Sequence, residues 1–207
     1  MRPVHFMPLI LATLMLAGCA TLPPKDYTEL RKSNPRSSLV LPPINESTEV
    51  GATYSVLTTT TAPLAELGYY VLPVAIVDQF LKENGLTVPG EMQQAPLNKL
   101  HEVFGADAVM YMTIEQYGSK YQVLSSNIII RIKAHLVDCR SGVTIWSGEA
   151  QTVGGGQSGL LQAVVTQIMN KLLDQAHGVA VMASRQLFMT PAQGLIKGPR
   201  HPEYGKD

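Results

Sequence analysis

The strongest constraint on the fold is an alternation of side-chain types between Ile128 and Leu136. Every second residue is apolar, while Arg131, Lys133 and His135 lie between the apolar positions. Because the side chains of a strand point to opposite faces in turn, this pattern predicts a strand with one buried and one wetter face. The following sequence DCRSG predicts a hairpin connection, in which Gly142 can take a positive φ, and VTIWSGEAQT predicts the returning strand.

Helix and strand patterns alternate through the rest of the chain. A three-to-four spacing of apolar residues predicts helices, and short apolar runs closed by proline predict strands. Pro63 predicts a kink or break in the first long helix. The order predicts the α/β (α+β) class: a mixed sheet with an antiparallel meander, packed by helices. Besides the meander, the expected strands are Leu39–Leu41, Gly68–Pro73 and Ala108–Tyr117, and the expected helices are Val50–Leu67, Pro73–Gly85, Pro96–Phe104 and Leu160–Leu187.

Residues 1–18 have the layout of a secretory signal peptide. Arg2 supplies a positive charge, and the apolar stretch behind it is far shorter than the ~20 residues that span a bilayer. The stretch ends in Leu16, Ala17, Gly18 and Cys19, which resemble the bacterial lipobox. The resemblance implies that signal peptidase recognises the first three and cleaves before Cys19, whose thiol and new amino group are acylated with chains such as palmitate.

Acyl chains on Cys19 would anchor the protein to a membrane, because each buried methylene contributes about 0.8 kcal/mol. The next residue is Ala20 rather than the aspartate that typically retains lipoproteins in the inner membrane. Outer-membrane sorting is therefore expected, with the periplasmic face and the cell surface both left open.

Composition divides the chain behind the leader. Residues 19–38 are polar and rich in proline, which predicts a lipidated tether. Residues 39–189 contain the expected strands and helices and predict a single α/β domain. The Pro- and Gly-rich residues 190–207 predict a disordered tail.

The charge balance argues against several partners. Lys plus Arg and Asp plus Glu both number 16, so no net charge attracts nucleic acid or steers an anionic substrate. Only 15% of residues are charged and 45% are hydrophobic, which indicates a globular chain with a substantial hydrophobic core and more apolar surface than a lone soluble protein needs. Once Cys19 is acylated, Cys139 has no partner in the chain; an inert thiol and an intermolecular disulfide are the two alternatives.

The glycine run at Gly154–Gly159 fits the spacing of a dinucleotide fingerprint. That fingerprint requires a further strand after its helix, with an acidic residue at the end of that strand, and Asp174 stands within the expected helix instead. We therefore expect no nucleotide and no other cofactor. A turn from strand to helix is the better interpretation, which makes Gly154, Gly155, Gly156 and Gly159 a candidate docking loop.

No catalytic or metal site is expected. The histidines are isolated from one another and from other ligand types, and Ser158 stands one residue short of a nucleophile elbow. Aromatic residues gather near strand positions, where they pack in the core or in part form an interface. These aromatic residues are Tyr54, Tyr69, Tyr70, Tyr111, Tyr117, Tyr121 and Trp146.

Several segments together resemble a proteobacterial family of outer-membrane lipoproteins of unknown function. These segments are the lipobox, LVLPP, YYVLP followed by VDQFLKENGL, FGADAVMYMTI and VDCRSGVTIWSGEA. In broader outline, Leu39 to Leu187 is similar to the periplasmic α/β module of CsgG, the curli-secretion lipoprotein, and to the amino-terminal domain of TolB. No segment here matches the membrane-crossing hairpins of CsgG or the propeller of TolB. The resemblance therefore implies an accessory, partner-binding domain held at the membrane.

Two functions follow from these observations. The first is a non-enzymatic accessory or scaffold component, expected to be a homodimer, in an envelope transport or secretion assembly. The alternative is a periplasmic small-ligand-binding lipoprotein for a peptidoglycan fragment or lipid. The first predicts an exposed apolar patch on a helix or sheet edge, and the second predicts a closed pocket with convergent polar groups.

Overall fold

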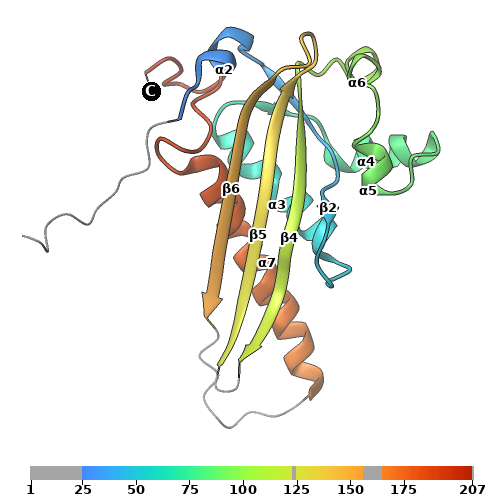
Figure 1. Ribbon diagram of the computed structural model, residues 1–207, viewed down its shortest axis with the longest axis vertical. Helices are drawn as coiled ribbons and strands as arrows, with labels where there is room; N and C mark the ends of the chain where they lie inside the picture. The colour runs from blue at the N-terminus through green and yellow to red at the C-terminus, as the bar shows by residue number, and fades with distance from the viewer. Residues whose placement is uncertain (1–24, 123–124, 156–164, 207) are drawn as a thin grey trace, which may run out of the picture.

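A computed structural model of the protein describes residues 25–122, 125–155 and 165–206. Within these residues one six-stranded mixed sheet has the order β3-β1-β4-β5-β6, with β2 paired to β4. Figure 1 shows β4, β5 and β6 side by side as the long strands of this sheet. The mixed α+β class is therefore confirmed. The strands are β1 Ser37–Val40, β2 Ile44–Asn45, β3 Tyr70–Val71, β4 Ala108–Gln122, β5 Ser125–Asp138 and β6 Thr144–Gly155.

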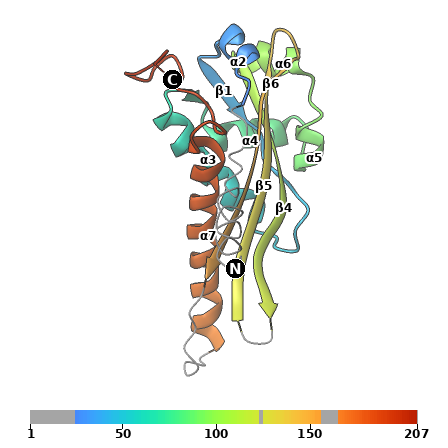
Figure 2. The same ribbon diagram turned by 60° about the vertical axis from the view of Figure 1, so that its left-hand side comes forward.

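Helices cover both faces of the sheet, as Figure 2 shows, with α3 and α7 on one face and α4, α5 and α6 on the other. Two features of these helices were not expected from the sequence: the short helix α2, in which Leu30 is buried, and the continuation of α3 past the buried Pro63. The helices are α2 Thr28–Ser33, α3 Ala52–Glu66, α4 Val74–Glu83, α5 Pro89–Met92, α6 Leu97–Phe104 and α7 Val165–Met189.

The predicted meander is present as β4, β5 and β6, which pair antiparallel in chain order. Ile128, Ile130 and Ile132 are buried, as their alternation predicts. On the opposite face of β5, Arg131 and Lys133 form ion pairs with Glu115. The β5–β6 turn closes at Gly142, whose φ of 69° is the positive value that the sequence allowed.

Two clusters of buried side chains lie on the two faces of the sheet. Met110, Met112 and Ile114 of β4 pack in the cluster that includes residues of α3 and α7. Val109 and Tyr111, which alternate with them, pack in the cluster that includes residues of α4, α5 and α6. Burial on both faces explains why the first part of β4 reads as a continuous apolar run.

The predicted break at Pro63 is wrong, because α3 runs on to Glu66. Pro63 and Leu64 are buried, and Thr59 and Ser184 join α3 to α7 through a buried hydroxyl–hydroxyl hydrogen bond of 2.8 Å. Only the last turn of α3 follows the proline, so the lost backbone hydrogen bond is offset by tertiary packing that the sequence pattern does not show.

The tether predicted over residues 19–38 is too long. Residues 19–24 lie outside the described structure, but the chain from Lys25 onward is folded. Leu30 of α2 is buried in the first cluster, and β1 already begins at Ser37. A helix of six residues with one buried side chain has too little apolar periodicity to be recognised from sequence.

The predicted disordered tail is also wrong for residues 190–206. Leu195 is buried, and the Gly194 carbonyl accepts hydrogen bonds from Trp146 Nε1 at 3.0 Å and from the Tyr27 hydroxyl at 2.7 Å. These donors come from distant parts of the chain, so composition alone could not reveal that they hold the segment in place.

Candidate functional site

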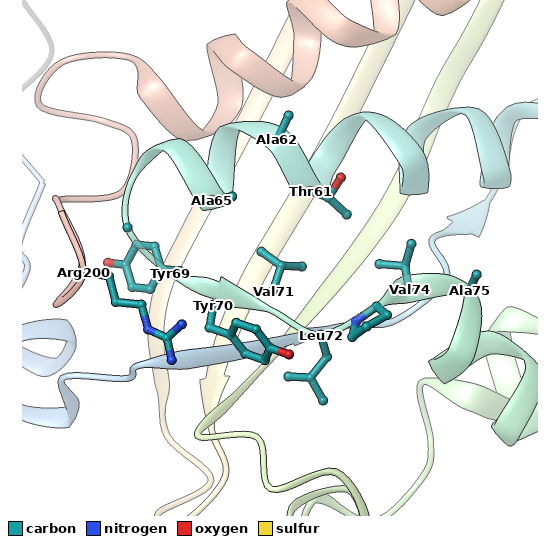
Figure 3. A pocket seen from close by; sticks show the side chains of 12 residues that line it. Thr61, Ala62, Ala65, Tyr69, Tyr70, Val71, Leu72, Val74, Ala75 and Arg200 are labelled. Carbon is teal, nitrogen blue, oxygen red and sulfur yellow. The ribbon is translucent and has the colours of Figure 1, made fainter.

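A groove lies beside β3, the strand at one edge of the sheet. Figure 3 shows its walls, formed by the C-terminal half of α3, by β3 and by the start of α4, with Arg200 reaching over from the C-terminal segment. The groove is open to the surface and has a volume of about 660 Å³. We call it the β3 groove, defined by Thr61, Ala62, Ala65, Gly68–Ala75 and Arg200.

The β3 groove is mainly apolar and contains one charged side chain. Small and branched residues line α3 and β3, and the Tyr70 side chain is 45% exposed. The Arg200 guanidinium lies 4.9 Å from the Tyr70 ring centroid, a cation–π contact that contributes about 0.5–1 kcal/mol at an exposed site. Among the described residues, no carboxylate forms an ion pair with Arg200, so its charge is available to a ligand.

The C-terminal segment positions Arg200 by pairing with the chain just before β3. The Gly198 N–H donates to the Leu67 carbonyl at 2.7 Å, and the Arg200 N–H donates to the Gly68 carbonyl at 3.1 Å. Sequence reasoning missed this part of the site because it assigned residues 190–207 to a disordered tail. The adjacent apolar residues Leu195 and Ile196 are the signal that could have found it.

The predicted docking loop is divided by the structure. Gly154 lies in β6 opposite Ile128, and a Cβ built on it would lie 2.4 Å from Cγ2 of Val179 in α7. Gly154 therefore permits close packing of helix on sheet rather than forming a loop. Gly155 ends β6. Gly156 and Gly159 lie outside the described residues, as do the lipobox residues Leu16, Ala17, Gly18 and Cys19.

The aromatic residues separate into core and surface positions. Tyr69, Tyr111, Tyr117 and Trp146 are buried, as packing residues are expected to be. Tyr54 and Tyr70 are exposed, and Tyr70 contributes to the β3 groove. The side chain of Tyr121 is not among those that the structure describes.

A polar cluster that the sequence did not reveal joins three elements. Ser55 of α3 forms hydrogen bonds with the Tyr117 hydroxyl of β4 at 2.6 Å and with His177 Nδ1 of α7 at 2.9 Å. A serine–histidine pair acts as nucleophile and base when a third group orients the imidazole. No carboxylate is hydrogen-bonded to His177 in the part of the chain that the structure describes. The cluster links α7 to α3 and β4.

Cys139 is a free thiol buried between the sheet and α4–α6. Burial, with a smaller effect of the Asp138 and Asp107 charges, raises its pKa to about 11. The thiolate is the reactive form, so this environment suppresses alkylation and disulfide exchange.

In a Cys19→Ser variant, Cys139 is the only cysteine of the chain. We expect its reaction with Ellman's reagent at pH 8 to be at least about tenfold slower in the native protein than in urea, because the folded state lowers both the thiolate fraction and access. Equal reaction rates with and without urea would contradict the interpretation of Cys139 as an inert, buried thiol.

Neither a metal site nor a membrane-spanning helix is found in the described ranges. No group of three or more His, Cys, Asp or Glu side chains there is arranged to hold a metal ion. None of the helices described is both long and apolar enough to cross a bilayer.

Comparisons with known proteins agree on one family. The model of the family described as "Putative lipoprotein GNA1162-like" matches residues 25–200. "Putative lipoprotein NMB1124/NMB1162" of Neisseria meningitidis serogroup B is 44% identical over 209 residues, covering 95% of this chain and 97% of the relative. The crystal structure of lipoprotein GNA1162 from Neisseria meningitidis is 43% identical, with a TM-score of 0.56, and the match covers 68% of this chain and 99% of that one. The protein described here belongs to the GNA1162-like lipoprotein family.

Proposed function

We propose that the protein is an outer-membrane lipoprotein, cleaved after Gly18 and anchored by acyl chains on Cys19. Membership in a lipoprotein family supports the anchor, and the sequence Leu16-Ala17-Gly18-Cys19 supplies the modification site. The folded chain begins by Lys25, close behind this cysteine. The domain is therefore held near the membrane surface.

At the membrane, the protein acts as a non-enzymatic accessory or scaffold component of an envelope transport or secretion assembly, as a homodimer. The β3 groove is the observation that carries this role, because it combines exposed apolar side chains, a sheet edge and a guanidinium that has no carboxylate partner among the described residues. Such surfaces bind other proteins. A small molecule in a groove open to solvent would stay largely exposed, so partner binding is favoured over the ligand-binding alternative.

The anchor is tested by replacing Cys19. We expect Cys19→Ser protein to move from the membrane pellet to the wash fraction, because the single thiol that accepts the diacylglyceryl group is gone. Cys139→Ser is the matched control and should stay in the pellet with the acyl mass intact. Retention of Cys19→Ser in outer membranes would refute the lipid anchor.

The accessory role is tested by extracting the tagged protein from native outer membranes in mild detergent, followed by mass spectrometry and light scattering. We expect envelope proteins in fixed ratio to a dimeric lipoprotein. A dimer that carries only a bound small molecule would overturn the accessory role and favour ligand binding.

A further inference from the structure

The backbone of β3 has one unused edge, at Val71. Tyr70 N–H donates to the Arg36 carbonyl at 3.0 Å, and Leu72 N–H donates to the Ser38 carbonyl at 3.1 Å, so both point toward β1. Since successive peptide groups of a strand point to alternate sides, the N–H and C=O of Val71 point away from β1. Within the described residues they have no hydrogen-bond partner. The edge therefore presents one donor and one acceptor to the β3 groove.

The C-terminal segment of the chain bonds to the turn just before β3, and within the described residues it makes no backbone hydrogen bond with Val71. Gly198 and Arg200 donate to the carbonyls of Leu67 and Gly68 from within a turn, which is closed by the His201 N–H donating to the Gly198 carbonyl at 2.9 Å. The protein thus already binds one of its own segments at the turn that leads into β3. The position of the next pairing partner, opposite Val71, lies in the groove.

The charge of the groove selects the occupant. Arg200 is its single charged lining residue, held over Tyr70 and without a carboxylate partner among the residues described. A guanidinium forms its strongest paired hydrogen bonds with carboxylates. An acidic side chain placed at this end of the groove would meet it.

The walls of the groove determine which side chains of the partner can lie on either side of the acidic residue. Ala62 and Ala65 of α3 and Val74 of α4 leave room for branched apolar side chains. The exposed apolar surface continues along α4 at Ile76, which is 63% exposed. A strand that alternates apolar residues with one Asp or Glu matches the edge, the walls and the charge together.

We propose that β3 is extended by an added strand: an extended segment of a partner protein, carrying Asp or Glu next to apolar residues, pairs with Val71 and places its carboxylate on Arg200. This inference rests on the proposed accessory function and names the site and chemistry of its partner. The pairing is short, so the affinity is modest, and attachment of both proteins to one membrane raises their effective concentration.

The test selects peptides from a random dodecapeptide phage library on the detergent-solubilised full lipoprotein. We expect selected peptides to alternate apolar residues around an Asp or Glu. Measured by fluorescence anisotropy, Val71→Pro should weaken peptide binding about tenfold, because proline removes the outward N–H of this edge strand. Arg200→Gln should weaken binding of the acidic peptide about tenfold. It should leave unchanged the binding of the analogue in which Gln replaces the acidic residue.

Two controls separate pairing from folding. Val103→Ser replaces an exposed valine on α6 and should leave binding unchanged. If Val71→Pro unfolds, N-methylation of the peptide tests the same pairing: methylating the one amide that donates to the Val71 carbonyl should weaken binding about tenfold, and methylating the adjacent amides should not. Failure of the library to enrich any peptide, or equal binding to wild type, Val71→Pro and Arg200→Gln, overturns the strand-addition site.

The proposed function can fail separately. If the wild type co-purifies with no envelope protein, the accessory role is wrong, even if the selected peptides bind to the β3 groove. If the same partners co-purify with wild type, Val71→Pro and Arg200→Gln in equal amounts, the accessory role stands and the β3 site is wrong.

Discussion

Gly68→Ala is expected to lower the free energy of unfolding by about 3 kcal/mol. Gly68 has a φ of +85°, which costs a residue with a side chain about 1 kcal/mol. The added Cβ would also lie 2.3 Å from the backbone nitrogen of His201. The C-terminal segment must then move away and lose its hydrogen bonds to Leu67 and Gly68, each worth about 1 kcal/mol. Urea denaturation measures the loss.

Gly85→Ala is the matched control for this variant. Gly85 has nearly the same φ, +89°, but nothing lies within 4 Å of its built Cβ. It should therefore lose only the conformational part, about 1 kcal/mol. Gly68→Ala should in addition make residues 190–206 sensitive to protease. Equal losses in the two variants, with no new cleavage, would show that the C-terminal segment does not pack on Gly68.

Asp138→Ala is expected to cost about 3 kcal/mol at pH 7. The residue is only 3% exposed, and its carboxylate accepts hydrogen bonds from Ser33 Oγ at 2.6 Å and from the Ser141 backbone N–H at 2.8 Å. Arg140 and the Ser141 hydroxyl also donate to it. Asp138 thus joins α2 to the β5–β6 turn, and removing it leaves several donors without their charged acceptor.

The same carboxylate predicts an acid-sensitive fold. Burial opposes its ionisation, but the hydrogen bonds from Ser33, Ser141 and Arg140 outweigh burial and hold its pKa well below the usual range. A carboxyl pKa that is lower in the folded state stabilises the fold above the unfolded value of about 3.9. This contribution disappears as the pH falls from about 4 toward the folded pKa.

Wild type should therefore lose stability between about pH 5 and pH 3 more steeply than Asp138→Asn, as measured by urea titrations across that range. Glu102→Ala removes a carboxylate from the exposed pair with Lys99 and should change stability by less than about 1 kcal/mol. Parallel pH curves for wild type and Asp138→Asn would contradict the role of Asp138.

Local sequence pattern was sufficient for the meander and the long helices. The alternation from Ile128 to Leu136 reflects one buried face and is visible in any window of the strand. The last helix was predicted over 160–187, and α7 covers Val165–Met189. Periodicity succeeds here because each element has a long stripe of buried residues, so its burial pattern repeats several times within one segment.

The candidate site had no comparable local signal. Tyr70 and Val71 belong to a strand of two residues, and Arg200 lies in a segment whose composition indicates disorder. The interpretation of Gly154 as part of a loop failed for the same reason, because the need for a small residue there comes from Val179 on α7.

The sequence by itself determined the family, the candidate lipid anchor at Cys19 and the order of the main strands and helices, because motifs and periodic burial are encoded within single segments. Only the tertiary structure decided that the C-terminal segment packs against Gly68 and Trp146 and that Arg200 lies over the Tyr70 ring of β3. Hydrogen bonds between residues that lie far apart in the sequence, 48 positions for Trp146 and Gly194, fix that arrangement, and such bonds leave no pattern in either segment alone.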